Sequence, residues 1–218
     1  MEKENKLILE TYFSTPIYTI SKPEFIDSVK KVSKKKLKAV KKEIGFNKDY
    51  PVIMSDNFFD HPKLEEFSSF IAQTSWSILS SQGYDVNNMG ITFNEMWTQE
   101  HHRGSYMEQH THRFGSQIVG FYFLSVPPDA PRVLFYDPRQ GAVQAKLPEN
   151  DTTKLSLASS VVNFEPKKGL FIFTNSWLAH SFNKNLSKKP FRFVHFNLTT
   201  TPLENNKQTK EEPEVEII

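Results

Sequence analysis

The spacing of apolar residues changes near Ile91, and this change constrains the fold more than any other feature of the chain. Before it, apolar residues recur three or four positions apart, which predicts one helix from the capping-box pattern Ser21–Glu24 to about Ile44 and a second from about Lys63 to Gln82. From Ile91 onward, apolar and polar residues alternate, as is typical of strands that bury one face. The chain is therefore expected to be α+β and mainly β, with helices packed on a sheet.

Short strand candidates fill most of the chain after the second helix. Besides the strand from Ile91, they lie at 106–112, 117–126, 132–136, 159–164, 169–174 and 191–199. Strands of this length and spacing predict a barrel or a jelly roll. Residues 7–20 are expected to add one or two short strands, and the polar segment 141–158 is predicted to be a long loop.

The length of 218 residues suits one domain, expected over 1–200, in which residues 1–90 supply the helices and residues 91–200 the jelly-roll core. Residues 201–218 are charged and are expected to form a flexible tail. The sequence contains no cysteine, which excludes thiolate metal sites and fits a reducing compartment such as the cytoplasm. We see no signal peptide or membrane span, and a net charge of +2 does not by itself indicate a nucleic-acid partner.

Two histidines, His110 and His112, are separated by a single residue. Side chains two positions apart on a strand point to the same face, roughly 7 Å apart. Two imidazoles placed in this way can reach one metal ion, and His180 is a candidate third ligand. Arg192 follows twelve residues later, inside an apolar run.

Many lysines lie on the outer face of the first predicted helix. They are Lys30, Lys31, Lys34, Lys35, Lys36, Lys38, Lys41 and Lys42. One interpretation is a basic patch for nucleic acid or an acidic protein. The favoured interpretation is a solvated helix face, because no arginine or aromatic residue is interleaved with the lysines.

Several segments, in this order, resemble the iron(II)- and 2-oxoglutarate-dependent oxygenases, in the prolyl-hydroxylase-like branch that includes small phage and bacterial proteins. The segments are Phe13–Tyr18, Trp97, Gly104–Tyr106, His110–His112, Gly120–Leu124, Tyr136–Arg139, Pro166–Gly169, Phe173, Ser176–His180, Arg192 and Phe196–Asn197. The resemblance covers most of the chain. It implies a double-stranded β-helix (a jelly roll) with the N-terminal helices packed on one sheet.

The resemblance also implies a reaction and a set of roles. Iron(II) would be held by His110, His112 and His180, and O2 and 2-oxoglutarate would be consumed as a substrate C–H bond is hydroxylated and succinate is formed. Arg192 would pair with the distal carboxylate of 2-oxoglutarate, because its planar guanidinium can bind a carboxylate at two points.

The sequence departs from the pattern of this family at two positions. Most members have aspartate or glutamate where this chain has His112, and the substitute carboxylates considered are Glu108 and, less favoured, Asp137. The hydroxylases often have a tyrosine that bonds the cosubstrate where this chain has Phe123. Three residues are candidates to replace that tyrosine, namely Tyr106, Gln99 and Gln117.

Other interpretations stay open at this stage. The chain could be a cupin-like barrel that binds a metal through three histidines without using 2-oxoglutarate, or an adaptor that docks through the basic helix Phe25–Ile44. His101 and His102 are expected in a loop, and His195, on the face opposite Arg192, is interpreted as a packing or surface residue. The substrate could be a peptide, a free amino acid, a nucleobase or a small metabolite.

Overall fold

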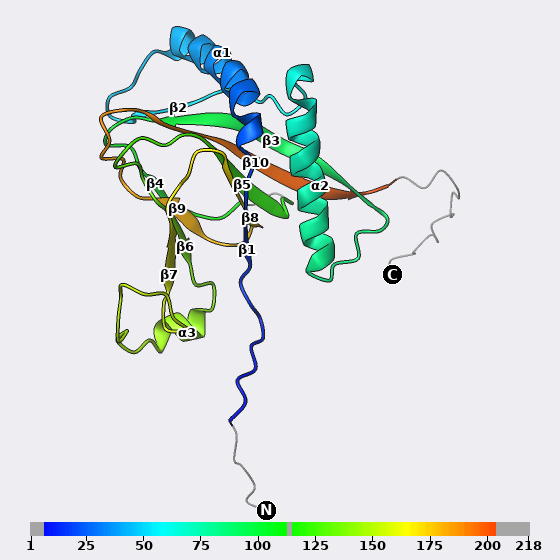
Figure 1. Ribbon diagram of the computed structural model, residues 1–218, viewed down its shortest axis with the longest axis vertical. Helices are drawn as coiled ribbons and strands as arrows, with labels where there is room; N and C mark the ends of the chain where they lie inside the picture. Colours follow the sequence, from blue (N-terminus) through cyan, green and yellow to red (C-terminus); the bar gives the residue numbers. More distant parts are fainter. Residues whose placement is uncertain (1–6, 113–114, 204–218) are drawn as a thin grey trace, which may run out of the picture.

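The computed structural model describes residues 7–112 and 115–203, and its strands form two antiparallel sheets (Figure 1). The larger sheet has six strands in the order β1-β8-β5-β10-β3-β2, and the smaller has four in the order β4-β9-β6-β7. The strands are β1 (Ile17–Ser21), β2 (Val52–Met54), β3 (Met89–His101), β4 (Met107–His110), β5 (Ile118–Ser125), β6 (Val133–Tyr136), β7 (Val161–Phe164), β8 (Leu170–Asn175), β9 (His180–Phe182) and β10 (Phe191–Pro202).

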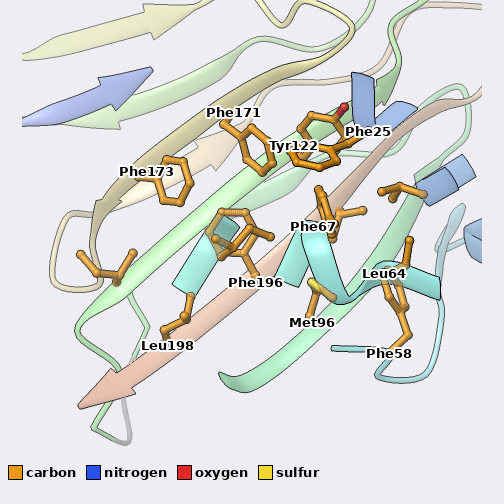
Figure 2. Close-up of a cluster of buried hydrophobic side chains, with 14 of the residues drawn as sticks. Phe25, Phe58, Leu64, Phe67, Met96, Tyr122, Phe171, Phe173, Phe196 and Leu198 are labelled. Atoms are coloured by element: carbon orange, nitrogen blue, oxygen red, sulfur yellow. The ribbon is translucent and has the colours of Figure 1, made fainter. Parts of the chain in front are cut away.

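Two long helices, α1 (Ile26–Ile44) and α2 (Glu65–Ser81), cover one face of the larger sheet. In Figure 1 both lie along that sheet, away from β6, β7 and the short helix α3 (Gln140–Gln144). Figure 2 shows Phe67 of α2 among the aromatic side chains of the sheet, with its ring centroid 5.2 Å from that of Tyr122 and 5.6 Å from that of Phe171. The expected jelly roll with helices packed on one sheet is confirmed.

Side-chain alternation divides the interior into two cores. On β5, Tyr122 and Leu124 point toward the helices, whereas Phe121 and Phe123 point into the space between the two sheets. On β10, the neighbours Phe193 and Val194 divide between the two cores in the same way. Both faces of the central strands are therefore buried, and apolar neighbours alone do not tell which face a residue occupies.

Four local features differ from what the sequence predicts. The loop predicted over 141–158 overlaps α3, and β9 was not expected at all. The predicted capping box does not form, because a 3-10 turn at Pro23–Phe25 precedes α1 and its first residues have no side-chain cap. The strand β10 runs on to Pro202, and residues 204–218 of the expected tail lie outside the described residues. None of the helices in 7–112 or 115–203 is long and apolar enough to cross a membrane.

Candidate metal centre

Three histidine side chains meet between the two sheets. His110 ends β4 and faces His180, its register partner at the start of β9. His112 follows β4, where its backbone N–H donates to the Ser176 carbonyl at 3.0 Å. The ring centroids of His110 and His180 are 4.5 Å apart, and one ring nitrogen of each of the three histidines lies within 4.8 Å of the others. The structure thus brings together the three residues that the sequence singled out as metal ligands.

Backbone carbonyls fix the orientation of two of these rings. The Nδ1 of His110 is 2.7 Å from the Glu108 carbonyl oxygen, and the Nδ1 of His180 is 3.0 Å from that of Leu178. A carbonyl oxygen can only accept, so Nδ1 carries the proton in both rings and Nε2 keeps its lone pair. This is the tautomer that binds a metal through Nε2.

The third ring, His112, is held by a chain of polar side chains. Its Nδ1 lies 3.0 Å from the amide nitrogen of Asn197, and that amide donates to Oε1 of Glu95 at 2.6 Å. The Nε2 of His112 is 3.3 Å from the Nε2 of His180, so the Nε2–H of His112 donates to the lone pair of His180. A metal ion bound to both nitrogens would take the place of that proton.

Burial keeps two of the imidazoles, those of His112 and His180, neutral. Burial, together with the positive charge that His110 can carry, lowers the pKa of His112 to about 4 and the pKa of His180 to about 3. A neutral imidazole offers the lone pair that a metal needs, so these two rings can bind a metal without first losing a charge.

A cavity of about 170 Å³ adjoins two of the three histidines, His110 and His112. Its lining residues are Met54, Trp97, Gln99, Met107, His110, His112, Phe121, Phe182 and His195. Most of this lining is apolar, but it contains the indole nitrogen of Trp97 and both ring nitrogens of His195, which are buried and have no hydrogen-bond partner among the described residues. Buried polar atoms without partners are uncommon in proteins, and they mark this cavity as a place for a polar ligand.

His195 is the residue at this site that the sequence interpretation undervalued. It is almost fully buried, and its ring centroid lies 4.8 Å from that of His112 and 4.6 Å from that of Trp97. Together with Glu95 and His112 it forms a second group of possible metal-binding atoms. The signal was present in the alternation of β10, which places His195 and Asn197 on the face opposite Arg192.

Arg192 does not face the metal centre, which corrects the position expected for it. It lies on the helix-covered face of β10, where its Nε donates to Oε2 of Glu100 at 2.5 Å. Its companions on that face, Val194 and Phe196, belong to the core under the helices. The expected apolar surroundings are present, but they belong to the other side of the sheet.

Of the other three residues considered as ligands of 2-oxoglutarate, only Gln99 lines the cavity of about 170 Å³. Gln99 lines the cavity, and its Oε1 lies 2.9 Å from the Nε2 of His101. Tyr106 is exposed in a separate cavity of about 520 Å³ that also reaches His110. Gln117 lines neither of these cavities, and its side chain accepts from the backbone N–H of Thr200 at 2.7 Å.

The positions of three further residues, Glu108, Asp137 and His101, also bear on the sequence interpretation. Neither Glu108 nor Asp137 joins a group of metal-binding atoms among the described residues, and Asp137 instead pairs with Arg139 at 2.8 Å. His101 is not a loop residue but the buried last residue of β3.

Comparison with known proteins gives one sequence match and many matches in fold. Residues 95–197 match a family described as "Putative 2OG-Fe(II) oxygenase", whereas no curated protein sequence matches the chain. A prolyl-4-hydroxylase from Pseudomonas putida aligns with a TM-score of 0.56 at 11% identity, over 84% of this chain and 93% of that one. AviO1 from Streptomyces viridochromogenes Tue57 aligns with a TM-score of 0.57 at 13% identity, over 85% of this chain and 90% of that one.

The viral collagen prolyl hydroxylase of Paramecium Bursaria Chlorella virus-1, solved in complex with 2-oxoglutarate, gives a TM-score of 0.53 at 12% identity, over 84% of this chain and 94% of that one. The family match spans the segment that carries His110, His112 and His180, and the fold is the one expected for that family. The cofactors of the family are iron(II), 2-oxoglutarate and O2. Over residues 95–197 the chain thus matches the 2-oxoglutarate- and iron(II)-dependent oxygenases in sequence, and its fold is similar to that of the prolyl hydroxylases.

Proposed function

We propose that this oxygenase holds iron(II) through His110, His112 and His180 and hydroxylates a C–H bond of its substrate. The observation that carries the proposal is the convergence of three imidazoles, with two rings oriented by backbone carbonyls, at the edge of a buried cavity. Imidazole is a good ligand for ferrous iron, and three protein ligands leave positions open for small molecules. When bound, iron and 2-oxoglutarate supply together with O2 the oxidant for the hydroxylation, and succinate and CO2 are released.

The ligand set bears on how the cosubstrate is held. With three neutral ligands, the two positive charges of iron(II) are balanced by the two negative charges of 2-oxoglutarate. No lysine or arginine lines the cavity among the described residues, so the loaded centre would be neutral as a whole. A carboxylate ligand would upset this balance unless a cation faced the cavity. Among the described residues, Glu95 is the carboxylate that groups with His112 and His195, and it accepts from the amide of Asn197.

Neutral donors are available for the distal carboxylate in place of Arg192. The indole N–H of Trp97 and the ring nitrogens of His195 are buried without partners among the described residues, and Gln99 lies beside them in the cavity lining. We assign these three residues to the cosubstrate. A carboxylate placed there would satisfy polar atoms that are otherwise costly to bury, which supports the assignment.

The side of His110 away from this cavity is our candidate for the substrate. The cavity of about 520 Å³ there is lined by Tyr50, Pro51, Tyr106, Gln109 and other residues, and it shares His110 and Met107 with the smaller cavity. Its size suits an amino acid, a small metabolite or an extended peptide side chain. A reducing compartment such as the cytoplasm would keep the iron ferrous, and the absence of cysteine supports that location.

An anaerobic titration tests the proposal. Iron(II) and 2-oxoglutarate are added to the purified protein, the visible charge-transfer band of the chelate is recorded, and succinate is measured after exposure to O2. We expect a band and succinate from the wild type and neither from His180→Ala. His61→Ala, at a histidine outside the centre, is the control and should behave as the wild type.

Tight metal binding without a band or succinate would contradict the proposal and favour the three-histidine barrel that does not use 2-oxoglutarate.

A further inference from the structure

A third cavity lies on the other side of the larger sheet, between α1 and strands β3, β5 and β10. Its volume is about 460 Å³. The lining residues are Lys30, Ser33, Lys34, Leu37, Lys38, Lys41, Glu100, Leu124 and Arg192. We call it the basic pocket, because five of these side chains are cations and one is an anion. None of its residues lines the cavity at the metal centre.

The helix brings its lysines to this pocket by their spacing. Lys30, Lys34, Lys38 and Lys41 recur three or four residues apart, so they form one stripe along α1. This stripe borders the buried face of α1, where Leu37 and Ser33 lie. The lysines therefore line the opening between helix and sheet, whereas Lys31 and Lys35 are exposed outside the pocket.

Glu100 holds two cations in place at the floor. Its side chain is only 1% exposed, and its oxygens accept from Lys41 Nζ at 2.6 Å and from Arg192 Nε at 2.5 Å. His102 Nε2 also lies 2.6 Å from Oε1. Burial acts to raise the pKa of Glu100, but the bonds from Lys41 and Arg192 outweigh it and hold the pKa below its usual value. Glu100 is therefore ionised, and it anchors the cations rather than neutralising all of them.

The pocket keeps a surplus of positive charge. Lys30, Lys34 and Lys38 make no ion pair within the described stretches of the chain. Arg192 uses its Nε for Glu100, and its two terminal amino groups have no hydrogen-bond partner among residues 7–112 and 115–203. Burial and then the nearby positive charge of Lys168 lower the pKa of Lys30, although Asp27 opposes this. An anion in the pocket would relieve this repulsion.

We propose that the basic pocket binds a small organic anion with two or more adjacent phosphate groups, such as a nucleoside di- or triphosphate. A guanidinium with its terminal amino groups unused suits the paired oxygens of a phosphate, and the lysines add point charges around it. Leu37 and Leu124 provide apolar surface for the organic portion of the ligand. The volume lies within the range of small-molecule sites.

The concave shape favours a small ligand over a nucleic-acid strand. A polymer backbone is bound along an open surface, and its binding would involve the outer lysines of α1 as much as the inner ones. In the structure the inner lysines surround a cavity with the sheet as its floor. This difference between the two sets of lysines gives the proposal a matched control.

Binding of ATP and pyrophosphate to the full chain, measured by calorimetry at low salt, tests the proposal. We expect both ligands to bind, inorganic phosphate to bind more weakly, and Lys34→Ala/Lys38→Ala to lower the affinity for ATP about tenfold through the loss of charge-assisted contacts. The control is Lys31→Ala/Lys35→Ala, which removes the same charge from the same helix and should change the affinity less than about twofold. All four lysines are exposed, so both variants should fold.

Three results would overturn the proposal. One is the absence of ATP and pyrophosphate binding to the wild type at millimolar concentration. Another is an equal loss of affinity in the two double variants, which would indicate general attraction to the charged helix. The third is a single-stranded oligonucleotide that binds more tightly than ATP and depends on both lysine pairs, which would make the helix a nucleic-acid surface.

Discussion

The Nε of Arg192 donates to Oε2 of Glu100 at 2.5 Å on the face of the larger sheet that α1 covers. The side chain of His195, three residues further along β10, lies on the opposite face against His112. A single strand therefore contributes a cation to one cavity and an imidazole to another. The arginine that the family resemblance assigned to 2-oxoglutarate takes part in a different electrostatic network.

Replacement of Arg192 by alanine is expected to leave 2-oxoglutarate binding intact. The charge-transfer band should form with the affinity of the wild type, because Arg192 does not line the cavity at the metal centre. The variant should lose about 1–2 kcal/mol of stability, since Glu100 keeps Lys41 but loses one charged hydrogen bond. Anaerobic spectra and urea unfolding measure the two effects.

The control for this variant is Arg132→Ala, which removes an exposed arginine just before β6 together with its hydrogen bond to Asn163, and should leave the charge-transfer band unchanged. Loss of the band in a folded Arg192→Ala protein would show that Arg192 binds the cosubstrate.

The replacement of Trp97 by phenylalanine tests the neutral donors. The change removes the indole N–H but keeps an aromatic ring beside His195. We expect the dissociation constant of 2-oxoglutarate to rise about tenfold while iron binding stays unchanged, because one hydrogen bond to a charged group is lost. Stability without ligand should stay equal or rise slightly, because a buried donor without a partner among the described residues is removed.

Trp177→Phe is the matched control, because Trp177 is exposed and lies outside the cavity at the metal centre. Equal 2-oxoglutarate affinity in Trp97→Phe and Trp177→Phe would remove Trp97 from the cosubstrate site.

Because Arg113 lies outside the described residues, Arg113→Ala belongs in the same series. A loss of 2-oxoglutarate affinity in that variant alone would mean that the cation Arg113, and not the neutral donors, binds the cosubstrate.

A charged ligand in place of His112 tests the charge balance of the centre. His112→Asp adds a negative charge at the metal, so iron(II) should bind more tightly and the 2-oxoglutarate dianion more weakly, each by about tenfold. His112→Asn has a similar size without the charge and serves as the control. Both affinities come from anaerobic titration, and an Asp variant that binds 2-oxoglutarate as tightly as the wild type would contradict the charge argument.

The alternating pattern predicted β10 but could not say which face meets the metal. Phe191, Phe193 and Val194 are apolar on both faces of the strand, so Arg192 has apolar neighbours whichever way it points. The face on which Arg192 lies depends on which face of the sheet α1 covers. Contacts between residues far apart in the chain determine where α1 packs. The three histidines were easier to find, because their side chains share one site and metal binding requires specific residue types.

The strand β9 was missed for a different reason. It has three residues, begins with the histidine itself and is too short to show a period. Its existence depends on pairing with β4 and β6, through His180 with His110 and with Phe135. The alternation of apolar and polar residues predicts long strands. A strand as short as β9 forms because of its pairing with neighbouring strands, which its own sequence does not show.

The stability of the metal-free protein is expected to fall as the pH decreases from about 6.5 to about 4. His101 illustrates the cause, because burial lowers its pKa from 6.5 to about 4. Between these values the unfolded chain binds a proton that the native protein does not, so acid favours unfolding, and the loss ends below the native pKa. Urea unfolding across this range measures the effect in the wild type and in His101→Phe, whose new ring would lie among Phe182, Phe191 and Phe193. The variant should show a shallower fall with pH, and parallel curves for the two proteins would mean that His101 titrates in the folded state as it does in the unfolded chain.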